Sequence, residues 1–271
     1  MTPGGVRFAR YAYPPNALGY CGPGDHLALF EYGTQGVEDG GLRALAREFD
    51  GAWPYLDLIA RCNGLEPLDE TVVESYWVGN GLLSQVGVSV FGDSMAERFR
   101  DRVGVAWEAV IEAVTAGAKP HHGFHVFCVY PWVGLMRTGS TSQPLRVLDQ
   151  CRIRWGTVTE VEGDTAVVRS QPLVLQDDRL SFGPPRPETV VWAADGRGLA
   201  ERVTPGDRVA MHWGWVCERL SSSAVRTLER ETAIAMRLAN RFLARPRIGI
   251  FAQRCVTLGW PTGFPRLRTS D

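Results

Sequence analysis

The chain has 271 residues, of which 45% are hydrophobic, and its nine tryptophans are enough to fill a substantial core. Its 29 basic and 30 acidic residues give a formal net charge of −1, which leaves no global positive field to hold nucleic acid or an anionic membrane. The first twenty residues lack the apolar run of a secretory signal, and no apolar stretch is long enough to span a bilayer. We therefore expect a folded cytoplasmic protein with neither a nucleic-acid partner nor a membrane partner.

The cysteines are sparse and form no CxxC pair, which excludes a disulfide scaffold and predicts reduced thiols. They occupy positions 21, 62, 128, 151, 217 and 255. Walker, GxSxG and HExxH motifs are absent, so nucleotide hydrolysis and the common hydrolytic chemistries have no support in the sequence.

The first half of the chain has a helical pattern. Apolar residues recur at spacings of three and four in segments 42–49, 54–62, 69–77 and 101–114, and Asp69 stands where a helix would begin. Segment 137–144 collects Gly, Ser, Thr and Pro and is typical of an exposed linker. We expect residues 1–136 to form an α-helical domain whose role the sequence does not indicate.

Beyond this linker the period changes to two. Strands are predicted around 152–161, 165–170, 173–175, 188–192 and 207–216, with Gly156 as the site of a bulge in the first. Five short strands fit a small closed barrel of the OB-like type, and a helix capped by serines follows from Ser221. The predicted fold class is therefore α+β, with a barrel-and-helix domain over residues 145–245 and a Pro, Gly and Arg-rich tail over 246–271.

Two motifs of the second half resemble a known family. The first is C-x-x-x-x-G-x-V at Cys151, Gly156 and Val158, followed by the hairpin sequence "EVEGDTAVV". The second is "PGDRVAMHWGWV", in which a Gly-Asp entry leads through apolar residues to His212 and then to Gly214 and an aromatic residue. In this order and spacing they resemble the HypC family of [NiFe]-hydrogenase maturation chaperones, over about residues 145–240.

This resemblance implies a metal carrier without turnover of its own. In the HypC family the leading cysteine and the strand histidine are associated with carrying an Fe(CN)2(CO) unit to the hydrogenase large subunit, so Cys151 and His212 become the candidate iron ligands. A soft thiolate and a neutral imidazole suit low-valent iron, and a site with two protein ligands can release its cargo. The implied partners are a hydrogenase large-subunit precursor and a HypD-like maturation factor.

The sequence departs from the family pattern around the cysteine. Cys151 lies behind some 150 residues, whereas the family keeps this cysteine at the N-terminus, and Trp155 replaces a proline before the glycine. Arg152 and Arg154 stand beside the cysteine, where they are expected to favour its thiolate and to attract an anionic cyanide-bearing complex.

A second candidate metal site lies in "PHHGFHVFC", residues 120–128. In a helix, His121, His125 and Cys128 would share one face and could bind zinc or iron, whereas in a strand the set would break up. Cys21 lies in a Gly and Pro-rich loop before a helix, where the helix N-terminus could stabilise its thiolate, or where Asp25 simply caps the helix.

The chain as a whole, with its N-terminal "RYAYPPN…GYCGP" segment, also resembles an uncharacterised actinobacterial family (DUF6390-like), which implies no activity. The sequence thus predicts a hydrogenase maturation accessory protein of the HypC type. The alternatives are a zinc or iron metalloprotein that uses His121, His125 and Cys128, and a metal-free interaction module.

Overall fold

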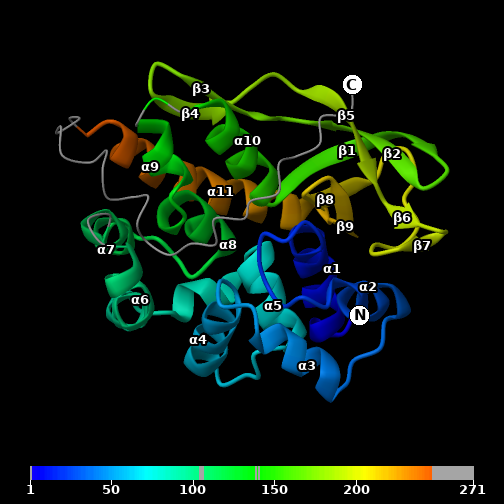
Figure 1. Ribbon diagram of the computed structural model, residues 1–271, viewed down its shortest axis with the longest axis horizontal. Coiled ribbons are helices and arrows are strands. Elements are labelled where there is room, and N and C mark those ends of the chain that lie inside the picture. The colour runs from blue at the N-terminus through cyan, green and yellow to red at the C-terminus, as the bar shows by residue number, and fades with distance from the viewer. Residues whose placement is uncertain (1, 104–106, 138, 140, 246–271) are drawn as a thin grey trace.

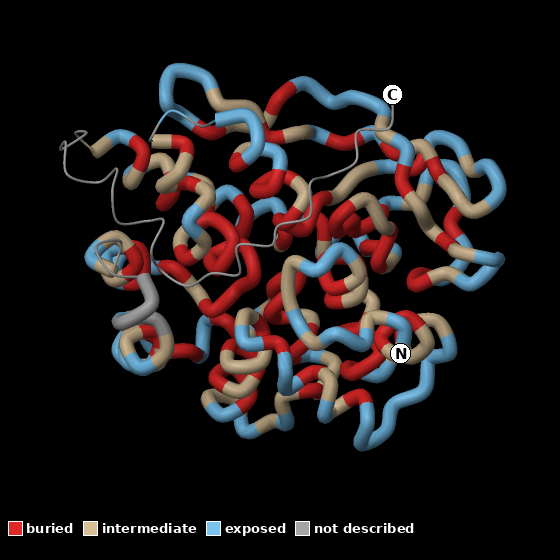
Figure 2. Tube along the Cα trace, in the orientation of Figure 1, coloured by how far each residue is buried: buried red, intermediate tan, exposed pale blue. Residues whose placement is uncertain are grey.

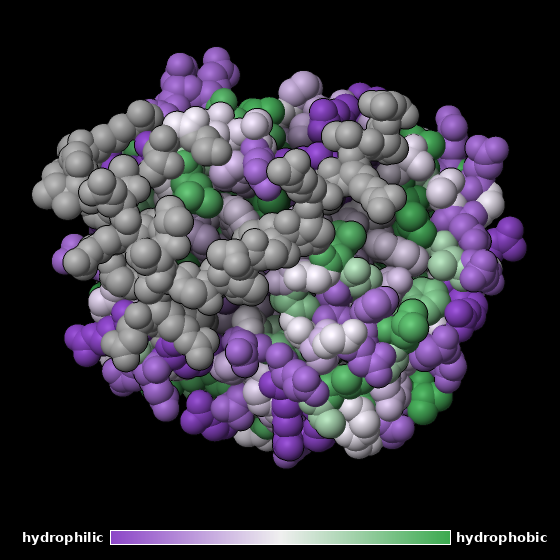
Figure 3. Space-filling view, in the orientation of Figure 1, coloured by the Kyte–Doolittle hydropathy of each residue, from purple (hydrophilic) through white to green (hydrophobic). Residues whose placement is uncertain are grey.

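The computed structural model describes residues 2–103, 107–137, 139 and 141–245 (Figure 1). Cys255 and the predicted tail of residues 246–271 lie outside the described residues. Within this part of the chain, no helix is long and apolar enough to cross a membrane. The face seen in Figure 3 is largely hydrophilic, with hydrophobic residues in separate small patches between the polar ones.

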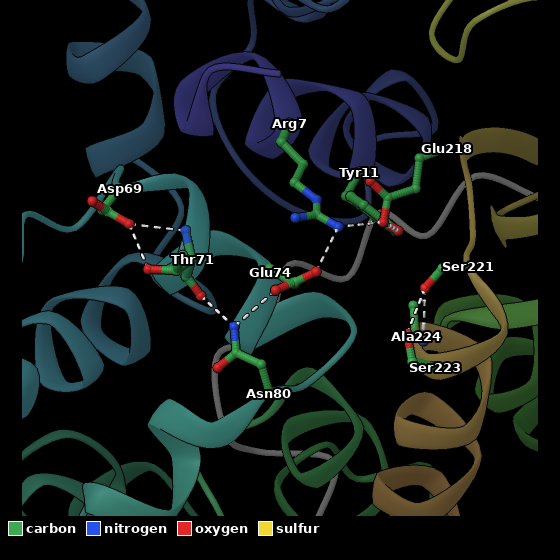
Figure 4. Close-up of polar contacts among 10 residues, drawn as sticks. All are labelled: Arg7, Tyr11, Asp69, Thr71, Glu74, Asn80, Glu218, Ser221, Ser223 and Ala224. Atoms are coloured by element: carbon green, nitrogen blue, oxygen red, sulfur yellow. Dashed lines mark hydrogen bonds and ion pairs between the residues drawn. The ribbon is translucent and has the colours of Figure 1, made fainter. Parts of the chain in front are cut away.

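The N-terminal region is helical, as the sequence predicts. Its elements are α1 (Gly4–Ala17), α2 (His26–Gln35), α3 (Gly40–Arg47), α4 (Trp53–Asn63), α5 (Glu70–Trp77), η1 (Gly81–Gln85), α6 (Val88–Val103), α7 (Trp107–Thr115), α8 (His122–Phe124), the π-helix η3 (His125–Val129) and α9 (Trp132–Arg137). Asp69 caps α5 by accepting a hydrogen bond from the Thr71 N–H (Figure 4). Asp25 caps α2 in the same way by accepting from the Ala28 N–H.

The sheet region follows a further helix, α10 (Ser142–Cys151). Its strands are β1 (Arg154–Glu162), β2 (Thr165–Ser170), β3 (Leu173–Gln176), β4 (Arg179–Phe182), β5 (Arg186–Val191), β6 (Ala193–Ala194), β7 (Arg197–Gly198), β8 (Arg208–His212) and β9 (Trp215–Arg219). Five of them pair in the order β1-β2-β5-β9-β8, and β8 returns to β1, so the sheet closes on itself. All neighbours in this ring are antiparallel except β5 and β9, which are parallel.

The last described helix, α11 (Ser222–Leu243), begins at the predicted serine cap, where the Ser221 hydroxyl accepts from the Ala224 N–H (Figure 4). It packs against α8, α9, η3 and β4. The Asn240 side chain makes two hydrogen bonds to the backbone of Leu180, which ties the β3-β4 hairpin to the helix. The predicted α+β class, with a helical N-terminal region, a sheet and a C-terminal helix, is confirmed.

The structure corrects three local predictions. Segment 137–144 is not simply a linker, because α10 begins inside it at Ser142; Cys151 therefore ends a helix and does not open a strand. The predicted strand 207–216 is a hairpin, since Trp213 and Gly214 both take positive φ angles (48° and 79°) and reverse the chain.

The third correction concerns Gly156, which is regularly paired, because the irregularity in β1 lies between Val158 and Glu160. A Cβ atom on Gly156 would lie 2.5 Å from Cγ1 of Val168 and 2.7 Å from the Arg169 carbonyl oxygen. The glycine is therefore required by the close approach of β1 and β2, not by a bulge.

The helical region and the sheet share one hydrophobic core. The largest cluster of buried apolar residues runs from α1, α4 and α5 to Ile153, to Ala210 and Cys217 of the barrel, and to α11. In Figure 2 the buried stretches gather in the middle of the molecule, where the helices meet the strands. Helix α1 lies at this junction and contacts α2, α3 and α5 on one side and β8 and β9 on the other (Figure 1).

A buried polar network joins α1 to the barrel (Figure 4). The carboxylate of Glu218 on β9 accepts hydrogen bonds from the Arg7 guanidinium and the Tyr11 hydroxyl, both at 2.7 Å. The side chains of Arg7 and Glu218 are 11% and 13% exposed, so solvent screens this pair weakly. Arg7 also reaches Glu74 of α5 at 3.4 Å, which links three parts of the fold through one cation.

Replacing Glu218 by Ala should lower the free energy of unfolding by about 3 kcal/mol, because a buried guanidinium and a buried hydroxyl lose their shared acceptor. Urea unfolding followed by circular dichroism measures this change. The matched control is Glu201→Ala, which removes an exposed ion pair with Arg219 and should cost less than about 0.5 kcal/mol. Equal costs for the two variants would contradict a structural role of the network.

Candidate functional site

A small cavity lies where α1, α8, the end of α10 and the end of β8 meet. Its volume is about 40 Å³. Its wall includes Pro15 of α1, Cys21 of the following loop, Trp77 of α5 and the β8-β9 turn residue Trp213. A volume of this size holds roughly three water-sized groups.

Three candidate metal ligands converge on this cavity. One donor atom each of His122, Cys151 and His212 lies within 4.8 Å of the other two. The three residues are 5%, 8% and 1% exposed. They come from α8, from the last residue of α10 and from the last residue of β8, so the fold brings together positions that are far apart in the sequence.

The tautomer of His212 follows from its hydrogen bond. Its Nδ1 lies 2.7 Å from the backbone carbonyl oxygen of Tyr11, and because a carbonyl only accepts, Nδ1 carries the proton and donates it. Nε2 then carries the lone pair and forms no well-aligned hydrogen bond among the described residues; the nearby Cys151 carbonyl, like that of Tyr11, raises the pKa of the ring against the larger effect of burial. Burial lowers the pKa of His212 to about 4, which keeps the ring neutral. This is the state in which imidazole binds a metal.

His122 differs because both of its ring nitrogens are engaged. Nε2 donates to the carbonyl oxygen of Cys151 at 2.8 Å, and this carbonyl is available because Cys151 ends α10. Nδ1 then has no proton and can only accept; the Tyr76 hydroxyl lies 3.3 Å from it, but the single hydroxyl proton is shared with the Gly51 carbonyl at 3.0 Å. Burial, and then the neighbouring His212, hold the pKa of His122 well below its usual value. His122 must release a hydrogen bond before it can bind a metal.

Cys151 is a protonated thiol in this structure. Burial raises its pKa well above the ordinary value, the nearby Cys21 thiol adds to the rise, and the Trp213 indole acts weakly in the opposite direction. The predicted stabilisation of a Cys151 thiolate by Arg152 and Arg154 is wrong, because both guanidinium groups are committed to carboxylates.

The two arginines sit in buried ion pairs. Arg152, 2% exposed, pairs with Asp149 at 2.9 Å and donates to the Gln171 carbonyl at 2.6 Å. Arg154 pairs with Glu188. Both arginines therefore hold the end of α10 against the sheet, and neither is a free cation for an anionic complex in the cavity.

One indole N–H group at the cavity is an unused donor. Nε1 of Trp77 is buried, and among the described residues it has no acceptor, whereas the Trp213 indole acts on the Cys151 sulfur. An unpaired buried donor costs about 1–3 kcal/mol. The Trp77 donor is therefore suited to an occupant of the cavity that carries hydrogen-bond acceptors.

The structure does not gather the second predicted set of ligands. Within the described residues one group of three candidate ligands converges, and it contains none of His121, His125 and Cys128. The strand alternative for this segment is wrong, since it forms α8 and a π-helix in which the Tyr130 N–H bonds to the His125 carbonyl five residues earlier. The wider π turn rotates Cys128 away from the face that a regular helix would give it.

The individual members of that set have other contacts. His121 accepts a hydrogen bond from the Gly123 N–H, and Nδ1 of His125 lies 3.0 Å from the Tyr55 hydroxyl. Burial raises the pKa of the Cys128 thiol to about 12. Cys21 lines the cavity, but burial raises its pKa to about 12 as well, so the predicted thiolate is wrong there too.

The sequence missed His122 as a member of the group. The helical and strand readings of 120–128 both left it off the face they considered, and its partners lie on α10 and β8. The one available signal was its place in a histidine-rich segment. Nothing in the sequence around Trp77 predicts that this residue lines the cavity.

The chain belongs to a family of unknown function (DUF6390), whose family model matches residues 1–246. Neither the curated proteins nor the solved structures contain a match. The matched range includes every residue of the cavity.

Acidification should destabilise the protein through its buried histidines. Burial lowers the pKa of His121, His125 and His212 to about 4, about 3 and about 4. The unfolded chain therefore binds protons below about pH 6.5 that the native state does not, and stability falls between that pH and about pH 4. At about pH 5 each histidine should lower the free energy of unfolding by about 2 kcal/mol relative to neutral pH.

Urea unfolding at the two pH values tests this expectation. His212→Gln should reduce the pH-dependent loss by about 2 kcal/mol, because it removes one of these buried neutral histidines. A loss that is the same in the wild type and in His212→Gln would contradict the assignment of His212 as a buried neutral histidine.

Proposed function

We propose that this member of the DUF6390 family is a metal-binding accessory protein that holds an iron–cyanide–carbonyl unit through Cys151 and His212 and passes it on in hydrogenase maturation. The acceptor in this proposal is a hydrogenase large-subunit precursor, and the donor is a HypD-like maturation factor. The protein then acts by binding and release, without turnover of its own.

One observation carries the proposal. The cysteine and the histidine that the two HypC-like motifs single out lie in the same cavity, with their donor atoms within 4.8 Å of each other. The pattern of Cys151 and Gly156 and the pattern around His212 were independent signals in the sequence. Their convergence in space supports a shared ligand.

The order of the barrel strands also supports a HypC-like domain. Counted along the chain, the five strands are β1, β2, β5, β8 and β9, and around the ring the last two exchange places so that β9 pairs with β5. A small closed ring of five strands is compatible with the OB-like barrel that we propose for the second half. Cys151 precedes the first strand, and His212 ends the fourth.

The cavity has the chemistry that such a cargo requires. Low-valent iron favours a thiolate and a neutral imidazole, and His212 presents Nε2 with a free lone pair. Cyanide and carbonyl ligands accept hydrogen bonds, and the indole N–H group of Trp77 lacks an acceptor among the described residues. The volume of about 40 Å³ suits a few small groups and no large organic ligand.

Binding must release a proton from Cys151, because burial keeps its thiol protonated while a metal needs the thiolate. The affinity should therefore rise with pH, by about tenfold per unit while one proton is released per metal. Tyr20, which is half-buried and stacks on Trp213 with 4.1 Å between ring centroids, places the loop after α1 in the wall of the cavity.

Infrared spectroscopy tests the cargo. Protein purified without oxygen from cells that express a hydrogenase maturation system should show cyanide and carbonyl stretching bands. Cys151→Ala and His212→Ala should each abolish the bands, because each removes one of two protein ligands. Cys62→Ala is the matched control: Cys62 is a half-buried thiol of α4 outside the cavity, and its loss should leave the bands intact. Bands that persist in both ligand variants would overturn the assignment.

A second candidate function is a resident zinc or iron centre with three protein ligands, Cys151, His122 and His212. The observation that favours it is the convergence of His122 on the other two. A tetrahedral centre with bonds of about 2.0–2.3 Å separates its ligand atoms by about 3.3–3.8 Å, so ligand atoms up to 4.8 Å apart need a contraction of about 1 Å. Three ligands and one open position are typical of catalytic zinc.

Cobalt titration distinguishes the two candidates. Wild-type protein and Co²⁺ should give a thiolate-to-cobalt absorption band that Cys151→Ala abolishes. If two ligands hold the metal, His122→Ala should weaken binding much less than His212→Ala, which should weaken it by about 100-fold. Equal losses in the two histidine variants would favour the three-ligand centre. His121→Gln, which alters a neighbouring buried histidine outside the group, is the control.

A further inference from the structure

The two consecutive prolines of "YAYPPN" lie inside a helix. Helix α1 runs from Gly4 to Ala17, so Pro14 and Pro15 both occupy helical positions, and both are buried. A proline has no backbone N–H, and its ring pushes away the carbonyl of the residue four positions earlier. The carbonyl of Tyr11 thus loses the donor that a regular helix would supply at position 15.

This released carbonyl is the acceptor for His212. The Tyr11 carbonyl oxygen lies 2.7 Å from Nδ1 of His212, and Ala17 ends the helix late enough that position 15 would otherwise donate to it. Pro14 acts on the carbonyl of Arg10, which points about 100° further round the helix. The two prolines therefore have the same chemistry but free different carbonyl groups, that of Tyr11 for Pro15 and that of Arg10 for Pro14.

We propose that Pro15 is a positioning residue for the metal ligand His212. By freeing the Tyr11 carbonyl, it fixes the proton of His212 on Nδ1 and leaves the lone pair of Nε2 for a metal in the cavity. The inference rests on the proposed metal site. It assigns a functional role to a proline whose position inside a helix lowers the stability of that helix.

The surroundings of Tyr11 support this role. Its ring stacks on Trp77 with 5.2 Å between centroids, and its hydroxyl donates to Glu218 at 2.7 Å. Tyr11 is therefore held at both its ring and its hydroxyl, so its carbonyl has a fixed position relative to β8. Ligating histidines commonly donate their second ring N–H to a backbone carbonyl, and loss of such a partner lowers metal affinity by about 10–100-fold.

Substitution of the prolines separates this role from a structural one. Pro15→Ala restores an N–H that competes with His212 for the Tyr11 carbonyl, and it removes a poor helix residue. The melting temperature should be unchanged or raised, while the affinity for Co²⁺ should fall about tenfold. Pro14→Ala, the matched control, should leave the Co²⁺ affinity at the wild-type value. If Pro15 had only a structural role, Pro15→Ala would change the melting temperature and the affinity for Co²⁺ in the same direction.

The tautomer can be read without any metal. Two-bond ¹H–¹⁵N correlation spectra of the metal-free protein should show His212 protonated at Nδ1 in the wild type and in Pro14→Ala, and a mixture of tautomers in Pro15→Ala. Protonation at Nε2 in the wild type would overturn the inference, as would a Pro15→Ala protein with unchanged tautomer and unchanged Co²⁺ affinity. If the wild type binds no Co²⁺, the proposed function fails, and the tautomer comparison alone decides the role of Pro15. If Pro15→Ala does not fold, the wild-type tautomer decides it.

Discussion

The contact between Tyr11 and the barrel holds the rest of the structure together. One residue of α1 stacks on Trp77 of the helical region, donates through its hydroxyl to Glu218 of β9 and accepts through its carbonyl from His212 of β8. The two halves of the chain therefore meet at the same residue that orients a candidate ligand. The site depends on this docking, because the cavity has one wall on α1 and another on the barrel.

Burial explains the protonation states of the cavity. A medium of low dielectric disfavours charge, so His122 and His212 are neutral bases and Cys151 is a neutral acid. The neutral imidazole of His212 is ready to bind a metal, whereas His122 must first release a hydrogen bond and the thiol must lose its proton. The metal-free site is thus stable without a counter-ion, and a bound metal would supply the positive charge that the thiolate lacks.

The sequence predicted what depends on local pattern. Alternation located the strands, and the caps at Asp69 and Ser221 are where the sequence placed them. Helix α1 was not foreseen, because its prolines oppose helix formation and the tertiary contacts that outweigh them are not visible in the sequence. Helix α10 was not predicted for a similar reason, because it starts within a segment of Ser, Thr and Pro that is typical of a loop.

The site was predictable only in part for the same reason. Cys151 and His212 were paired by two motifs, but His122 reaches them from a π-helical segment whose spacing the regular helical period does not describe. The two arginines were misassigned for different reasons. Glu188, the partner of Arg154, lies on β5 and has no signature in the neighbouring sequence, whereas Asp149 is only three residues from Arg152 but pairs with it because α10 ends between them.

The end of α10 gives Cys151 a property that a cysteine at a free chain end would lack. The carbonyl groups at the C-terminus of a helix carry partial negative charge, which disfavours a thiolate there. Burial acts in the same direction, so the thiolate persists only while a cation compensates it. In the proposed function a proton would then compete with the metal for the sulfur, and this competition would favour transfer of the metal over its permanent retention. The N-terminal helical region contributes the Tyr11 carbonyl to this site.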